Sequence, residues 1–243
     1  MSRLGTVGAA RRGHAVITHV FFDFFGTLVD YDPSVHPANR NAPWEFARRA
    51  DVPISEDESD KKWQKVWDDL DADAHRTGRE FSMHDVAHHF WRSIGSPAVG
   101  SDSTDALIAE YFEAWTADVF VAAGALECVA DLASDHTLAI VSNTHDSRLV
   151  PRLARQFGLH DHFDRIVTSV DVGWRKPHPK IYEAALRDCQ ASAGNAVFVG
   201  DNWTADVEGP RQAGMSAIYV GPPAEERPTV TLKELPELVR SLA

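Results

Sequence analysis

From residue 124 onward, short apolar runs alternate with amphipathic stretches, and this alternation restricts the possible folds more than any other feature of the chain. It is typical of βαβ units, whose parallel strands form a sheet that helices cover on both faces. The apolar run 16–22 predicts one more strand of that sheet. The predicted strands are 137–142, 165–170, 196–200 and 217–220, and the predicted helices are 146–157, 179–189, 204–213 and 232–242. The sequence therefore predicts an α/β fold.

The segment between the first strand and the alternating region has a different, helical pattern. Apolar residues recur there at the spacing of one helix face, as in Trp63, Trp67 and Leu70. Ser55 and Glu58 have the spacing of a capping box, which predicts that this helix begins after Ser55. We therefore predict a discontinuous core with an inserted all-helical cap. The predicted boundaries are a flexible N-terminal arm at 1–15, the core at 16–30 and 122–243, and the cap at 31–121.

Composition excludes several classes of protein. The chain has 243 residues and a hydrophobic fraction of 44%, which is enough for a core domain and a smaller second one. The formal net charge of −12 argues against a nucleic-acid or anionic-membrane partner. No apolar run approaches the roughly 20 residues of a membrane span, and residues 1–14 lack the apolar region of a signal peptide. Cys128 and Cys189 have no ligand-like spacing, so we expect free buried thiols and a cytoplasmic protein. No feature sets the oligomeric state.

Asp23 ends the first predicted strand and is followed at once by a turn containing Gly26 and Thr27. In open parallel sheets, ligands bind beyond the carboxyl ends of the strands. Gly26 would let the backbone approach a ligand closely. Aspartate also favours turns, so Asp23 by itself is explained equally well as the end of a strand.

Three more polar clusters follow or lie near predicted strands. Ser142 and Asn143 offer a hydroxyl and main-chain N–H groups for an anion, although such a pair is also a common helix N-cap. Lys176 precedes Pro177, which favours an extended backbone, and its charge is either directed inward or solvated. Asp201 and Asp206 suit a hard divalent cation, although Asp201 or Asn202 also suits a helix N-cap. Together the clusters predict one site at the ends of the strands.

With these four motifs the chain resembles the haloacid dehalogenase-like (HAD) superfamily, and it is most similar to members with a helical C1-type cap inserted after the first strand. The resemblance covers nearly the whole chain and implies a Rossmann-like parallel core sheet. The matching residues are Asp23-Phe24-Phe25-Gly26-Thr27, Ser142-Asn143, Lys176-Pro177 and Gly200-Asp201 through Asp206.

The resemblance implies a hydrolase that transfers a phosphoryl group through a covalent intermediate on Asp23. Lys176 would neutralise charge and position Asp23. The implied substrate is a small anionic, phosphorylated metabolite. The implied phosphate-binding residues are Gly26, Thr27, Ser142, Asn143 and Lys176, and the implied Mg²⁺ ligands are Asp23, the main-chain carbonyl of Phe25, Asp201 and Asp206.

Phe25 departs from the pattern of the superfamily's phosphatases, which usually carry a second aspartate at this position. That aspartate protonates the leaving group and later activates water, and loss of a general acid–base costs on the order of 10²–10⁴ in rate. Phe25 therefore predicts a substrate with a good leaving group, or an acid recruited from elsewhere. The candidate acids are His145 and the cap residues His84, His88 and His89.

Two other functions remain open. The 2-haloacid dehalogenases of the superfamily also lack the second aspartate, and their halide leaves without a proton. They work without magnesium, however, and lack the acidic pair, whereas Asp23, Asp201 and Asp206 would repel one another without a cation. We therefore rank the phosphatase first. The other alternative is a catalytically weak relative that binds a phosphorylated ligand.

The cap face over Asp23 is expected to select the substrate. Phosphonoacetaldehyde hydrolases use a cap lysine, but a solvated helix face explains Lys61, Lys62 and Lys65 better. The sequence offers Trp44, Arg48, Trp63 and Trp91 as candidates for this face.

Overall fold

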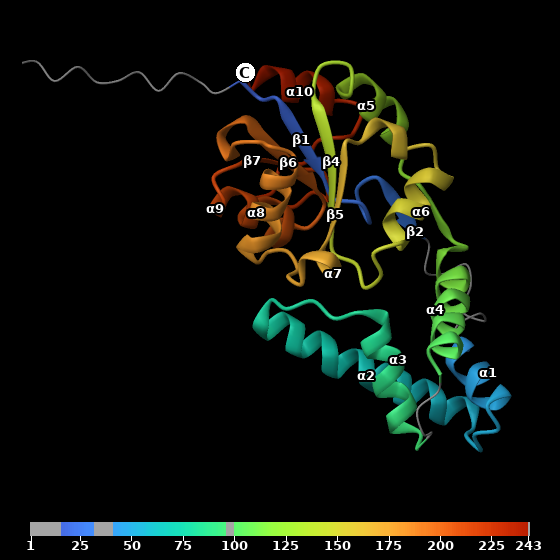
Figure 1. Ribbon diagram of the computed structural model, residues 1–243. Helices are drawn as coiled ribbons and strands as arrows, with labels where there is room; N and C mark the ends of the chain where they lie inside the picture. Colours follow the sequence, from blue (N-terminus) through green and yellow to red (C-terminus); the bar gives the residue numbers. More distant parts are fainter. Residues whose placement is uncertain (1–15, 32–40, 96–99, 243) are drawn as a thin grey trace, which may run out of the picture.

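The computed structural model describes residues 16–31, 41–95 and 100–242 (Figure 1). Its centre is a sheet of five parallel strands in the order β5-β4-β1-β6-β7. This confirms the predicted α/β class and places β1 between β4 and β6. The strands are β1 (His19–Phe22), β4 (Thr137–Ser142), β5 (Arg165–Thr168), β6 (Ala196–Gly200) and β7 (Ser216–Tyr219).

Helices cover both faces of the sheet, because its central strands are apolar on both sides. On one face, Phe21 and Phe198 pack with Tyr182 of α8, and all three are fully buried. On the other face, Phe22 and Val199 belong to a second apolar core, which continues into the cap. The core-domain helices are α5 (Ala125–Leu132), α6 (Leu149–Gln156), α7 (Ser169–Val172), α8 (Pro179–Asp188), α9 (Gly209–Gln212) and α10 (Leu235–Ser241).

Four cap helices lie on the side of the sheet at which the strands end (Figure 1). The Ser55 hydroxyl accepts a hydrogen bond from the Glu58 main chain, so α2 begins as predicted, and α2 ends at Gly78, whose φ is 75°. Both halves of a capping box are present instead at Ser82 and Asp85, where α3 begins. The cap helices are α1 (Ala42–Arg49), α2 (Glu56–Thr77), α3 (Met83–Ser93) and α4 (Ser101–Thr116).

Short elements depart from the sequence predictions. β2 (Val29–Tyr31) and β3 (Val119–Val121) pair antiparallel where the chain enters and leaves the cap, and three residues are too few to show a periodicity. The predicted strand 165–170 stops at Thr168 because α7 follows directly. The predicted helix 204–213 divides into a π-helical turn, η4 (Trp203–Glu208), and α9. Two 3₁₀ turns complete the core, η2 (His160–His162) and η3 (Ala193–Asn195).

Several predictions concern the chain as a whole. The predicted arm at 1–15 lies outside the described residues, and the cap boundaries at 31 and 121 stay predictions. In the described parts of the chain, no helix combines the length and the hydropathy needed to cross a bilayer. Cys128 is a free, buried thiol as predicted, while the free thiol Cys189 is half-buried.

Candidate active site

A cavity of about 250 Å³ lies at the carboxyl ends of β1, β4 and β6. Asp23 directly follows β1, Ser142 ends β4, and Asp201 directly follows β6. Because the three strands are neighbours in a parallel sheet, their ends meet at one edge. The residues that line the cavity are Asp23, Phe25, Ser142, Asn143, Lys176, Asp201, Asn202 and Ala205.

Lys176 points into this cavity, as the inward alternative predicted. Its Nζ lies 2.9 Å from Asp23 Oδ1 and 2.7 Å from Asp206 Oδ1. Burial by itself would lower the pKa of Lys176, but the charges of Asp206 and Asp23 outweigh burial and raise it. Lys176 is therefore a fixed positive charge beside Asp23, with only 2% of its side chain exposed.

Asp23, Asp201 and Asp206 form an acidic cluster in which one carboxylate oxygen of each lies within 4.8 Å of the others. Burial and the charge of Asp23 raise the pKa of Asp201 to about 6. Burial also raises the pKa of Asp206, against the opposing effect of Lys176. Three partly or fully buried acids facing one lysine carry excess negative charge. A divalent cation that prefers carboxylate oxygens would balance it, so the donor set fits Mg²⁺.

Two glycines allow the acidic cluster to pack against the backbone. Gly26 has φ +83°, and a Cβ at this position would overlap the carboxylate of Asp201. A Cβ at Gly200 would overlap the side chain of Asp206 in the same way. Next to Gly26, Thr27 is buried, and its Oγ1 donates to Asp201 Oδ1 at 3.4 Å. The predicted close approach at Gly26 is therefore an approach to a carboxylate of this chain.

Ser142 and Asn143 are not a helix N-cap. The predicted helix from residue 146 begins at Leu149, so a loop separates it from β4. Ser142 is fully buried at the cavity. The Asn143 side chain accepts a hydrogen bond from Lys176 N at 2.8 Å and donates to Lys176 O at 3.1 Å. Asn143 therefore fixes the backbone from which Lys176 reaches Asp23, a role that sequence reasoning missed.

Phe25 lies at the mouth of the cavity with its ring half-buried. The ring packs edge-on against Phe24 and Trp115, at centroid distances of 5.0 and 5.4 Å. A hydrocarbon ring thus occupies the position at which the superfamily's phosphatases place an acid. It also joins the cavity to Trp115 of the cap.

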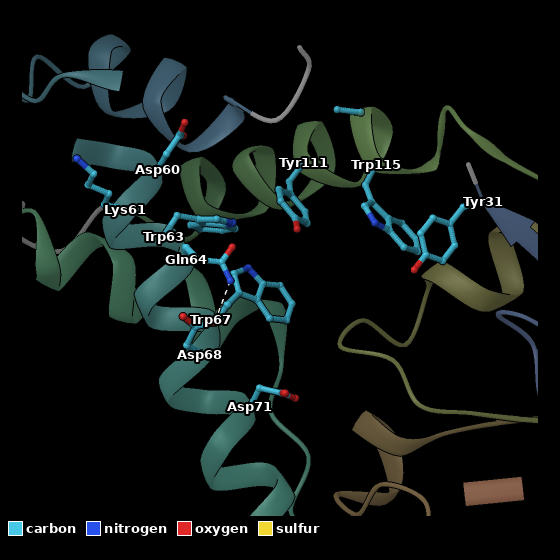
Figure 2. Close-up of a pocket in the computed structure, with 11 residues that line it drawn as sticks. Tyr31, Asp60, Lys61, Trp63, Gln64, Trp67, Asp68, Asp71, Tyr111 and Trp115 are labelled. Carbon is cyan, nitrogen blue, oxygen red and sulfur yellow. Dashed lines mark hydrogen bonds between the residues drawn. The ribbon is translucent and has the colours of Figure 1, made fainter. Parts of the chain in front are cut away.

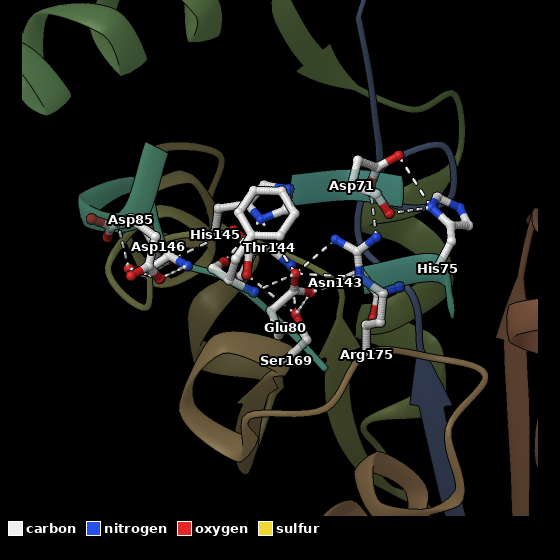
Figure 3. A network of polar contacts seen from close by, with 12 residues as sticks. Asp71, His75, Glu80, Asp85, Asn143, Thr144, His145, Asp146, Ser169 and Arg175 are labelled. Carbon is white, nitrogen blue, oxygen red and sulfur yellow. Dashed lines mark hydrogen bonds and ion pairs between the residues drawn. The ribbon is translucent and has the colours of Figure 1, made fainter. Parts of the chain in front are cut away.

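Glu80, between α2 and α3, joins the cap to the core (Figure 3). Its carboxylate accepts hydrogen bonds from Ser169 Oγ at 2.6 Å and from Arg175 Nη2 at 2.7 Å, and its side chain is wholly buried. Arg175 also donates to Asp71 Oδ1 of α2 at 2.7 Å. Because Arg175 directly precedes Lys176, the network connects the position of the cap to the loop that contains Lys176.

Acid is expected to weaken this cap–core contact. Burial would raise the pKa of Glu80, but His145 and Arg175 together lower it from 4.5 to about 2. The ionised carboxylate therefore contributes fully to stability above about pH 4.5. That contribution, about 3 kcal/mol, is lost as the pH falls from about 4.5 towards 2. Urea unfolding of the wild type and of Glu80→Gln between about pH 3 and 7 measures it.

The two proteins should differ most in unfolding free energy near neutral pH and converge in acid. Glu113→Gln is the matched control, since Glu113 is an exposed glutamate of α4. A difference that stays constant across this pH range would show that the charge of Glu80 does not stabilise the contact.

The candidate histidine acids do not line the cavity around Asp23. The ring of His145 stacks on Phe81 at 4.2 Å, and its Nδ1 lies 3.1 Å from Phe81 O and 3.4 Å from Glu80 Oε1. His84 pairs with Asp105 at 2.8 Å with about half of its side chain exposed, and His88 and His89 are exposed on α3. His145 therefore belongs to the Glu80 network.

A larger cavity of about 790 Å³ lies between α2, α4 and Tyr31 (Figure 2). Of the four cap candidates, Trp63 lines it. Trp91 is buried in the cap core, and the Trp44 indole donates to Ile54 O. Arg48 pairs with Glu45 on the surface. Lys61 also lines the cavity, but its Nζ pairs with Asp57, whereas Lys62 and Lys65 bond Ser93 O and Asp69.

Comparison with known proteins identifies similar chains. A family model described as haloacid dehalogenase-like hydrolase matches residues 17–214. The human haloacid dehalogenase-like hydrolase domain-containing protein 3 is 46% identical over 88 residues, which are 36% of this chain and 34% of that protein. The chain therefore aligns with about a third of that relative's length.

Two further similarities extend over most of the chain. A ribulose-1,5-bisphosphate 5-phosphatase of Halopiger xanaduensis is 27% identical over 217 residues, 87% of this chain and 88% of that protein. The crystal structure of a 2-haloacid dehalogenase from Pseudomonas syringae superimposes with a TM-score of 0.67 at 25% identity. That alignment covers 94% of this chain and all of the other.

Proposed function

Because the chain belongs to the haloacid dehalogenase-like hydrolase family, we propose that it is a magnesium-dependent phosphatase acting on a small phosphorylated metabolite. The observation that carries this proposal is the cluster of Asp23, Asp201 and Asp206 around Lys176. An enzyme that worked without a cation would gain nothing from two further acids, Asp201 and Asp206, crowded beside its nucleophile. The phosphatase name of the Halopiger relative supports a phosphate ester as substrate. The free thiols Cys128 and Cys189 accord with the proposed cytoplasmic location.

In this proposal Asp23 is the nucleophile. Its carboxylate attacks phosphorus and displaces the leaving-group oxygen, and water then hydrolyses the aspartyl phosphate. Lys176, 2.9 Å from Asp23 Oδ1, holds the carboxylate in position. The Ser142 hydroxyl and the main-chain N–H of Asn143 would hold the phosphoryl oxygens. The N–H groups of Gly26 and Thr27, also predicted for this role, already donate to Val29 O and Phe24 O.

The proposed magnesium ligands are Asp23, Asp201 and Asp206 with the main-chain carbonyl of Phe25. A bound Mg²⁺ would neutralise charge on the transferred phosphoryl group. Lys176 bonds both Asp23 and Asp206, so this side chain also keeps two of the ligands at a fixed separation.

A 2-haloacid dehalogenase is the second candidate. Phe25 favours it, because a halide leaves without a proton, and the Pseudomonas syringae structure has a similar fold. The acidic cluster argues against it, since uncompensated acids raise one another's pKa values, as at Asp201, and disfavour a charged nucleophile. We therefore keep it as the alternative, and the experiment with EDTA described below distinguishes it from the phosphatase.

Hydrolysis of 4-nitrophenyl phosphate is expected to require Mg²⁺. Excess EDTA should reduce the release of 4-nitrophenol to background, and added Mg²⁺ should restore it, because the ion balances the charge at the acidic cluster. Asp201→Asn should weaken the response to Mg²⁺. Asp161→Asn, a change at a fully exposed acid, is the matched control and should not.

Two results would contradict the proposal. Hydrolysis that continues unchanged in EDTA would exclude a role for the metal. Release of chloride from 2-chloropropionate in EDTA, with no hydrolysis of phosphate esters, would establish the dehalogenase instead.

A further inference from the structure

The larger cavity is an aromatic cleft, which we define by Tyr31, Trp63, Trp67, Tyr111 and Trp115 (Figure 2). Trp63 and Trp67 project from α2, Tyr111 projects from α4 towards them, and Trp115 of α4 lies beside Tyr31. Trp63 and Trp67 lie 5.3 and 6.5 Å from the Tyr111 ring, and the Trp67 and Tyr111 planes are 27° apart. Trp63, Trp67 and Tyr111 therefore pack against one another as one aromatic surface of a space that has the size of a small-molecule site.

The aromatic cleft adjoins the cavity that contains Asp23, although the two have no lining residue in common. Trp115 of the cleft lies 5.4 Å from Phe25, ring to ring, and Phe25 lines the catalytic cavity together with Asp23. Tyr31 lies 6.0 Å from Trp115 at the same end of the cleft. The two cavities therefore meet at the contact between Phe25 and Trp115.

The charged residues of the cleft disfavour a second phosphate. Asp60, Asp68 and Asp71 line it with one basic residue, Lys61, and Asp71 is paired with Arg175. Lys61 is mostly exposed and its Nζ pairs with Asp57 at 2.6 Å, outside the lining. An anionic group in the cleft would face a net negative surface. The leaving group that fits is flat and carries no negative charge of its own.

The chemistry at Phe25 points to the same kind of leaving group. With no acid at this position, the oxygen must leave as an anion. A phenolic oxygen does so readily, since the pKa of a phenol is near 10. We propose that the substrate is the phosphate ester of an aromatic hydroxyl compound, with its ring in the aromatic cleft. This inference rests on the proposed phosphatase function and specifies its substrate class.

The reaction balances without a further reactant. The Asp23 carboxylate forms a bond to phosphorus while the bond between phosphorus and the aryl oxygen breaks. The electron pair of that bond leaves on the oxygen, and the aryloxide takes its proton from water. Water then hydrolyses the aspartyl phosphate and releases inorganic phosphate.

The test compares two phosphate compounds that both have good leaving groups, of which one carries a ring. The aryl ester is 4-methylumbelliferyl phosphate, and the compound without a ring is the acyl phosphate acetyl phosphate. Trp67→Leu should lower kcat/KM for the aryl ester by about 10-fold or more, as expected for the loss of a stacking side chain. It should change kcat/KM for acetyl phosphate less than about twofold. Trp44→Leu, at a half-buried cap tryptophan outside the cleft, is the matched control and should affect neither substrate.

A measurement on the wild type does not depend on how the variants fold. The aromatic product 4-methylumbelliferone should inhibit hydrolysis of acetyl phosphate, and glycerol at the same concentration should not. An equal effect of Trp67→Leu on both substrates, or no inhibition by the aromatic product, would overturn the inference while leaving the phosphatase intact. If the wild type hydrolyses neither substrate with Mg²⁺, the proposed function itself is wrong.

Discussion

Replacing Asp23 by asparagine is expected to lower kcat/KM for an aryl phosphate by about 10⁴-fold or more. The amide keeps the size of the side chain but removes the nucleophilic oxygen anion, and loss of a covalent nucleophile has effects of this order. The fold should persist, because Lys176 keeps its 2.7 Å ion pair with Asp206 and one of three mutually repelling carboxylates is removed. Steady-state kinetics with 4-nitrophenyl phosphate and Mg²⁺ measure the loss, and circular dichroism verifies the fold.

Asp30→Asn is the matched control for this experiment. Asp30 lies seven residues further along in β2, is exposed, and does not line the catalytic cavity. The control should retain wild-type activity. An Asp23→Asn protein that is folded and keeps more than about a tenth of the activity would show that Asp23 is not the nucleophile.

Phe25→Asp is expected to raise kcat/KM for alkyl phosphates by on the order of 10²–10⁴-fold. An alkoxide leaves poorly without a proton, and the new carboxylic acid would supply one from the mouth of the catalytic cavity, where the Phe25 ring lies. Aryl phosphates should gain much less, because their oxygen leaves without help. A plot of kcat/KM against leaving-group pKa should therefore be steep for the wild type and flatter for the variant.

Phe25→Asn distinguishes the effect of a new proton donor from the effect of removing the Phe25 ring. Asparagine removes the contacts with Phe24 and Trp115 just as aspartate does, but it cannot act as an acid. We expect no gain with alkyl phosphates. An equal gain in both variants would attribute the effect to the bulk of Phe25, and a flat wild-type plot would mean that another group already provides the proton.

Much of the fold and of the catalytic cavity could be predicted from residues close together in sequence. Apolar runs of strand length predicted all five strands of the sheet, two of them with the observed ends and three with ends that differ by up to three residues. The first predicted strand, 16–22, begins later, at His19. Polar residues directly after these runs predicted the shared site, because parallel strands end at one edge of a sheet.

Residues that act through distant partners could not be predicted in this way. Glu80 reads as an ordinary polar residue after a helix, yet its carboxylate bonds Arg175, which is 95 residues away. The Ser142-Asn143 pair was also consistent with a helix N-cap. The actual partner of Asn143, the Lys176 backbone, is 33 residues away. Local patterns contain no information about such pairs, so both roles required the tertiary structure.

The sequence alone determined the class of fold, the order of the motifs and the residue types of the catalytic cavity, since these follow from local periodicity and from the geometry of parallel strands. The tertiary structure decided which side chains meet. It separated His145 from the catalytic cavity and joined Phe25 to Trp115. It also brought aromatic residues of α2 and α4 together as one cleft. The physical reason is that these contacts depend on how the cap packs over the sheet, which is set by many weak long-range interactions at once.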